Sequence, residues 1–204
     1  SRVENDAVRD ALMFGLTGIT LNSSKMYKER ESGRGISNGT YYVPQVSREM
    51  VVTNGFDYKV ETQLIPAFGE LGEIQASDVR ISTQSAAEMA AIPSNSVDYI
   101  FTDPPYAEKV QYGELNFVWE AWLDFDTSWH DEEIIVNEVR GKTAADWAAL
   151  MKQAMAECHR VLKPGRWLSL CYHDTSEGTW AMVQDLMAEV ARNPVSVHHS
   201  CPKR

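Results

Sequence analysis

The chain has 204 residues, enough for one domain of ordinary size, and its 44% hydrophobic and 24% charged residues exclude wholesale disorder. Its formal net charge of −10 argues, on its face, against a nucleic-acid partner. Apolar runs are too short to cross a bilayer and no charged-then-apolar leader opens the chain, so we expect a cytoplasmic protein without a membrane partner.

Two parts are expected along the chain, residues 1–76 and residues 77–204. In the first part, apolar side chains at three- and four-residue spacing predict a helix over 4–22. A polar loop over 23–40 and a short strand over 40–43 follow. A second helix is expected over 56–71, and it must kink or divide at Pro66. This part does not alternate strand and helix.

Positive charge gathers in the 23–40 loop, on Lys25, Lys28, Arg30 and Arg34, among Ser, Gly and Asn residues. Such a composition is typical of a solvated loop. It also suits a loop that contacts phosphates, for which Lys25 and Lys28 are the candidate residues. The sequence leaves both interpretations open.

The second part alternates strands and helices. The expected strands are 79–83, 97–102, 167–172 and 195–199. The expected helices are 85–91, 114–123, 143–162 and 177–191, the third opened by the capping signature Thr143-x-x-Asp146. This α/β alternation predicts a mainly parallel sheet with helices on both faces.

An apolar strand, 97–102, runs directly into Asp103-Pro104-Pro105-Tyr106. Ligands of open parallel sheets bind at the carboxyl ends of strands, so the tetrapeptide is placed for a site. Two prolines stiffen the turn and remove local N–H donors, while their carbonyls remain. Asp103 adds a carboxylate and Tyr106 adds a flat ring. The result is an acceptor-rich notch beside a stacking surface.

Such a notch suits an exocyclic amine on an aromatic ring. The Asp103 carboxylate and the Pro104 carbonyl can accept its two N–H bonds, which frees the nitrogen lone pair to attack an electrophile held in line. Pro105 holds the turn, and Tyr106 stacks on the ring. A base in a duplex reaches this notch only when it is flipped out. The alternative is a rigid turn with an aspartate cap.

The tetrapeptide resembles motif IV of the amino-group DNA methyltransferases, which use S-adenosylmethionine. Asp in the first position and Tyr in the last resemble the N6-adenine group. Residues 81–86 and 96–98 resemble the usual approach to this motif, and 163–168 resembles the Leu-Lys-Pro-Gly-Gly entry to the next core strand, with Arg166 in place of the second glycine.

A closer resemblance, to the large adenine-specific DNA methylases, rests on residues 106–122, on 23–26 and on 39–44. It implies a Rossmann-like (class I methyltransferase) fold that is incomplete here, S-adenosylmethionine as cofactor and DNA as partner. The glycine-rich cofactor loop of that class is expected in a missing upstream part of the same protein. Oligomeric state stays open.

Other candidate residues follow from position. Tyr112, Glu114 and Asn116 come early enough in the 114–123 helix region to face the base or the cofactor. Phe117, Trp119 and Trp122 are expected in the core. On the cofactor side we place Thr102, Asp103 and His173, since His173 ends a buried strand; a polar turn is the alternative for His173. Three cysteines without a C-x-x-C pair indicate no metal site.

The resulting expectation is an enzyme that methylates adenine N6 in DNA, of which this chain is the catalytic, carboxyl-terminal part and could be inactive on its own. Two alternatives remain. An RNA methyltransferase acting on guanine N2 can also carry Asp-Pro-Pro-Tyr, and a degenerate fragment could bind nucleic acid without turnover.

Overall fold

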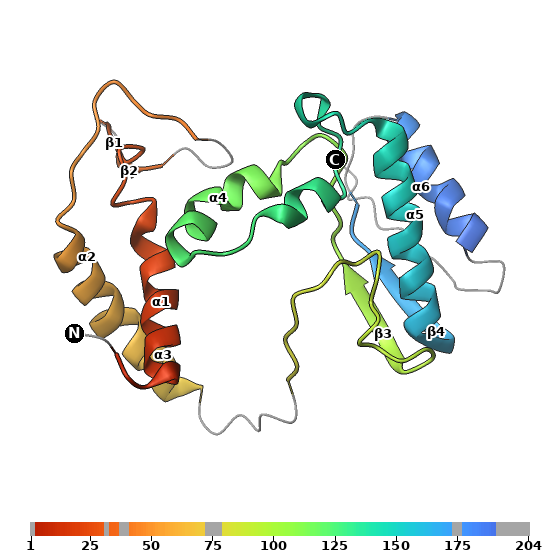
Figure 1. Ribbon diagram of the computed structural model, residues 1–204, viewed down its shortest axis with the longest axis horizontal. Helices are drawn as coiled ribbons and strands as arrows, with labels where there is room; N and C mark the ends of the chain where they lie inside the picture. Colours follow the sequence, from red (N-terminus) through yellow and green to blue (C-terminus); the bar gives the residue numbers. More distant parts are fainter. Residues whose placement is uncertain (1–2, 31–32, 37–40, 72–78, 173–176, 191–204) are drawn as a thin grey trace. The chain divides into compact units, whose positions relative to one another are not determined.

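The computed structural model describes residues 3–30, 33–36, 41–71, 79–172 and 177–190 (Figure 1). Its chain forms two compact units. Unit 1 comprises Ser1–Ile81 and Tyr112–Thr127, and unit 2 comprises Ser82–Gln111 and Ser128–Arg204. The predicted parts differ from these units in two respects. Residues 79–81 and residues 112–127 were expected with the second part, and both group with the first.

Unit 1 is built on helix α1 (Asp6–Thr20), which begins where the Asn5 side chain accepts a hydrogen bond of 3.1 Å from the Val8 N–H. A second helical run lies against α1. It consists of α2 (Val52–Lys59), the π-helix η1 (Val60–Leu64) and α3 (Ile65–Glu70). Ile19 of α1 and Leu64 of η1 are buried. Both predicted helices of this part are confirmed, although the second begins four residues earlier than expected.

The predicted break at Pro66 takes the form of a π-turn. The Ile65 N–H donates to the Val60 carbonyl, five residues back, just before the proline. Proline has no N–H, and its ring clashes with the carbonyl four residues back in a regular α-helix. A wider turn ahead of Pro66 therefore lets the run continue as α3.

Helix α4 (Tyr112–Leu123) completes unit 1. The Trp119 indole N–H donates to the Thr17 carbonyl of α1 at 2.9 Å, and the Tyr41 hydroxyl donates to the Leu115 carbonyl at 2.5 Å. The expected loop 23–40 contains a short antiparallel hairpin, β1 (Lys28–Arg30) and β2 (Gly33–Gly35). The prediction of a strand over 40–43 is wrong for residues 41–43, which are irregular.

Unit 2 is centred on two parallel strands, β3 (Val97–Thr102) and β4 (Leu162–Leu170). Strand β3 has the bounds that the sequence predicted, whereas β4 starts earlier and ends earlier than 167–172. Their register runs without interruption from Tyr99 opposite Trp167 to Thr102 opposite Leu170. Residues 79–83 form no strand, and 85–91 form turns and irregular backbone in place of a helix, so both of those predictions are wrong.

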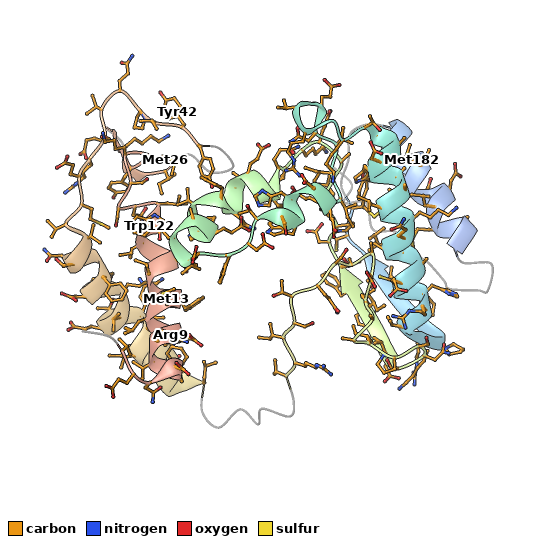
Figure 2. All side chains as sticks on the ribbon, viewed as in Figure 1. Arg9, Met13, Met26, Tyr42, Trp122 and Met182 are labelled. Atoms are coloured by element: carbon orange, nitrogen blue, oxygen red, sulfur yellow. The ribbon has the colours of Figure 1, made fainter. Side chains whose placement is uncertain are left out.

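Two helices cover one face of this sheet (Figure 1). Helix α5 (Ala144–Val161) begins with the predicted capping box, in which the Thr143 and Asp146 side chains each accept from the other's backbone N–H. Helix α6 (Glu177–Val190) packs beside it, with Met182 near the core (Figure 2). The buried cluster they form with β4 contains Trp147, Met151, Ala154, Met155, Cys158, Leu162, Leu168, Val183 and Met187.

The opposite face of the sheet carries aromatic side chains. Tyr99, Phe101 and Trp167 are 54%, 67% and 45% exposed. Helices on both faces were expected; within the described residues, α5 and α6 pack on one. The strand expected over 195–199 lies outside the described residues. The fold is thus a mixed α/β arrangement with a small parallel two-stranded sheet. In the described part of the chain, no helix combines the length and apolarity needed to span a membrane.

Candidate functional site

The Asp-Pro-Pro-Tyr segment lies at the carboxyl ends of the two parallel strands of unit 2. Asp103 follows the last residue of β3 directly. Beyond the end of β4, the Cys171 N–H still donates to the Thr102 carbonyl at 2.9 Å. Residues 171–172 therefore continue beside the start of the segment. This is the edge where parallel sheets place their ligands.

Asp103 and Tyr106 form a hydrogen-bonded pair. The Tyr106 hydroxyl donates to Asp103 Oδ1 at 2.5 Å across the turn made by the two prolines. Asp103 is exposed and Tyr106 is half-buried. A carboxylate has about four lone-pair sites on its two oxygens, so Asp103 keeps acceptor capacity for an incoming N–H group while Tyr106 holds its orientation.

The Tyr106 ring lies close to Tyr172 and Lys109 of unit 2. The Tyr172 ring meets it edge to face, with centroids 5.1 Å apart and planes at 75°. Lys109 Nζ lies 5.8 Å from the centroid of the Tyr106 ring, near the outer limit of a cation–π contact. Lys109 is exposed, and a planar ligand that stacks on this face of the Tyr106 ring would have to displace its ammonium group.

Both prolines of the segment are half-buried, and neither can donate a hydrogen bond. Together with the Asp103 carboxylate, the Pro104 carbonyl makes the turn rich in acceptors. This composition favours a ligand that donates two N–H bonds from one nitrogen.

The residues predicted on the following helix fall in the other unit. Tyr112, Glu114 and Asn116 occupy the first turns of α4, which belongs to unit 1, and all three are exposed. Their predicted contact with a base stays a prediction. Of the aromatic residues expected in the core, Trp119 is half-buried, but Phe117 and Trp122 are exposed, at 54% and 67%; Trp122 lies near the end of α4 (Figure 2).

The candidate phosphate contacts also lie in unit 1. Lys25 is exposed, in the turn that closes when the Tyr27 N–H donates to the Ser24 carbonyl at 3.1 Å. Lys28 is half-buried at the start of β1, where its backbone bridges to Ser47. The two lysines therefore flank the entry to the hairpin.

On the cofactor side, Thr102 is the half-buried last residue of β3, and His173 lies outside the described residues. Gly15 and Gly18 are packing residues of α1. A Cβ at Gly15 would lie 2.7 Å from Leu64 Cδ1, and one at Gly18 would lie 2.6 Å from Lys59 Cε. These glycines make room for neighbouring helices rather than open toward a ligand.

Sequence reasoning missed three residues near the motif. Tyr172 could have been found, because it is the last residue of the strand predicted over 167–172. Gln111 and Asn137 join across 26 residues through a bond of 2.8 Å from Asn137 Nδ2 to Gln111 Oε1, which no local pattern signals. Within the described residues, no three His, Cys, Asp or Glu side chains gather as a metal site would require.

Comparisons of the chain with protein-family models, with curated proteins and with solved structures found no match.

Proposed function

We propose that this chain methylates the N6 amine of adenine in DNA, with S-adenosylmethionine as the methyl donor. The observation that carries the proposal is the exposed Asp103 carboxylate, fixed by the Tyr106 hydroxyl at the carboxyl end of a parallel strand. The proposal treats β3 and β4 as two strands of a Rossmann-like sheet, which their parallel pairing supports.

The residues of the notch act on the amine of a flipped adenine. Asp103 and the Pro104 carbonyl accept its two N–H bonds, which favours a more tetrahedral nitrogen with an available lone pair. Tyr106 stacks on the base after Lys109 leaves its ring. S-adenosylmethionine, when bound, would supply a methyl group on a positively charged sulfur, which would keep the electron pair of the broken bond while the lone pair of the amine nitrogen forms the new one. The proton then leaves the nitrogen to water.

The described residues could contact S-adenosylmethionine on one of its sides. The negative charge of the Asp103 carboxylate would favour the positive sulfur of such a donor. Thr102 and Asp103 are the described residues that would face it. Gly15 and Gly18 are occupied with helix packing and do not supply a glycine-rich turn for its methionine part.

A methyl-transfer assay tests the proposal. Labelled S-adenosylmethionine is offered with an adenine-containing DNA duplex or with a structured RNA, and the modified base is identified. We expect N6-methyladenine in the DNA arm. Label in guanine of the RNA arm would overturn the proposal in favour of the RNA enzyme, and label in neither would contradict catalysis by this chain.

Two variants of neighbouring acids sharpen the assay. Asp103→Ala should reduce the rate roughly 10²–10³-fold, because one placed electrostatic contact is lost. Asp98→Asn serves as the control: Asp98 lies on β3, the strand that Asp103 follows, is exposed, and pairs with Lys163 at 2.7 Å. We expect it to leave the rate close to that of the wild type.

A further inference from the structure

Ala107, directly after the motif, has an unusual backbone conformation. Its φ is 50°, in the left-handed region. Among the described non-glycine residues, positive φ occurs also at Asn95 and Asp124, two residue types whose short polar side chains can stabilise it locally. Alanine has no such group. Support for this conformation must therefore come from outside the residue.

The turn that contains Ala107 is closed by a hydrogen bond of 3.1 Å from the Lys109 N–H to the Tyr106 carbonyl, and further support comes from residues 136–137. The Val136 N–H donates to the Ala107 carbonyl at 3.2 Å. The Gln111 side-chain amide donates to the Val136 carbonyl at 3.1 Å and to the Glu108 carbonyl at 3.2 Å, and its oxygen accepts from Asn137 at 2.8 Å. The turn that follows Tyr106 is thus tied to Val136 and Asn137 by both backbone and side chains.

The segment that provides this support, residues 128–142, is held together by its own hydrogen bonds and by an ion pair. Asn137 and Lys142 exchange two backbone hydrogen bonds of 2.9 Å each. Arg140 pairs with Glu133 at 3.0 Å, with side chains only 19% and 5% exposed, and its guanidinium also donates to the His130 carbonyl. Lys142 is buried, and its ammonium group donates to the Asp131 carbonyl. Desolvation is the main cause that lowers the pKa of Lys142, and the nearby positive charge of Arg140 lowers it further.

From these contacts we propose that Gln111 and Asn137 are positioning residues, which hold Ala107 in its left-handed conformation and thereby set Tyr106 against Asp103. The inference rests on the proposed function for its importance to catalysis, but its geometry stands apart from it. If Ala107 relaxes to negative φ, the chain direction after Tyr106 changes, and the hydroxyl loses its place beside the Asp103 carboxylate.

The test reads the Tyr106 hydroxyl directly by NMR, without substrate or cofactor. The 204-residue chain is prepared with tyrosine labelled with ¹³C at the ring carbon that bears the hydroxyl. The signal of Tyr106 is the one that disappears in Tyr106→Phe. Its position in Asp103→Ala gives the chemical shift of a hydroxyl without this acceptor. Because no turnover is needed, a chain that fails to methylate DNA still answers the question.

Two near-isosteric variants remove hydrogen bonds of the Gln111 side chain. Asn137→Asp loses the donor to Gln111 but keeps the oxygen that accepts from the Arg140 N–H at 3.0 Å. Gln111→Glu loses the donors to Val136 and Glu108. Each should move the Tyr106 signal most of the way to its position in Asp103→Ala. Adding Ala107→Gly to Asn137→Asp should move it back, since glycine adopts positive φ without strain.

Arg160→Lys is the matched control. Arg160 holds the turn before β3 through the carbonyls of Ile92 and Met89, at 3.0 and 2.9 Å. This variant should lower the unfolding temperature of the chain and leave the Tyr106 signal in place. If the Tyr106 signal stays in place in both Asn137→Asp and Gln111→Glu, or if Arg160→Lys shifts it equally, the inference is overturned. Should Asn137→Asp fail to fold, Gln111→Glu alone decides.

Discussion

The Tyr106 hydroxyl donates a hydrogen bond of 2.5 Å to the Asp103 carboxylate, so the first and last side chains of the Asp-Pro-Pro-Tyr segment act as a pair. A stacking role for Tyr106 uses only its ring. The observed bond adds a second role, because it limits the orientations of the carboxylate that is proposed to receive the amine.

These two roles predict graded effects at Tyr106. Tyr106→Phe keeps the ring and loses the bond, and we expect a rate decrease of about tenfold, which corresponds to about 1.4 kcal/mol, near the lower end for hydrogen bonds to charged groups. Tyr106→Ala also loses stacking, worth about 1–3 kcal/mol per base, and should be slower still. The measurement is steady-state methyl transfer to a DNA duplex. If Tyr106→Phe has the wild-type rate, the hydroxyl has no role in the mechanism. If Tyr106→Phe and Tyr106→Ala have equal rates, stacking on the ring has none.

The two α1 glycines give opposite predictions for stability. Alanine is favoured over glycine inside a helix by about 1 kcal/mol. At Gly18 a new Cβ meets only the flexible end of Lys59, so Gly18→Ala should raise the free energy of unfolding. At Gly15 it meets Leu64 at 2.7 Å, which is buried and cannot move freely, so Gly15→Ala should lower it. Urea denaturation measures the free energy of unfolding of both variants. If Gly15→Ala also stabilises the chain, η1 packs loosely on α1.

The capping box of α5 supports a third prediction. The Thr143 hydroxyl accepts from the Asp146 N–H at 3.3 Å, and the Asp146 carboxylate accepts from the Thr143 N–H at 2.8 Å. Thr143→Ala should therefore lower the free energy of unfolding by about 1 kcal/mol, whereas Thr143→Ser keeps the hydroxyl and should stay within a few tenths. Thermal unfolding followed by circular dichroism measures both. Equal losses in the two variants would mean that the methyl group, and not the cap, matters.

Elements with a strong local signal were predictable from the sequence. Strand β3 is an apolar run between the turn at 93–96 and two prolines, so local residues set both of its ends. Helix α5 begins at its capping box and ends just before the Lys163-Pro164-Gly165 stretch. Within the motif, the position of Asp103 after a parallel strand could also be predicted from the rule for ligand sites in open sheets.

The errors lie where distant residues decide the backbone. Residues 85–91 were expected to form a helix, yet the Met89 N–H donates to Glu157, and the Met89 carbonyl accepts from Arg160, about 70 positions along the chain. Ile81, in the segment expected to form a strand, is 91% exposed, because in the described part of the chain residues 79–83 pair with no other strand. Helix α4 was predicted, but its grouping with unit 1 depends on Trp119 and Tyr41, whose partners the sequence does not identify.

The carboxylate of Glu157 yields a prediction about acid. It accepts two bonds from Arg160, at 2.7 and 2.8 Å, and one from the Met89 N–H at 2.8 Å. These hydrogen bonds lower the pKa of the Glu157 carboxyl group from 4.5 to about 2, and the largest effect is that of Arg160. A carboxyl group whose pKa is lower in the folded chain stabilises the fold fully above its unfolded pKa, and this contribution disappears as the pH falls through the folded value.

Glu157→Gln should therefore lower the unfolding temperature near neutral pH, and its difference from the wild type should shrink as the pH falls from 4.5 toward 2. The control is Glu138→Gln, at an exposed glutamate of the 3-10 helix η3 (Glu138–Arg140) in the same unit; it should show a small difference at every pH. Thermal unfolding across this range gives both curves. If the Glu157→Gln difference stays constant down to pH 2, the charge of Glu157 does not stabilise the fold, and the hydrogen bonds that a glutamine can replace account for the contacts of Arg160.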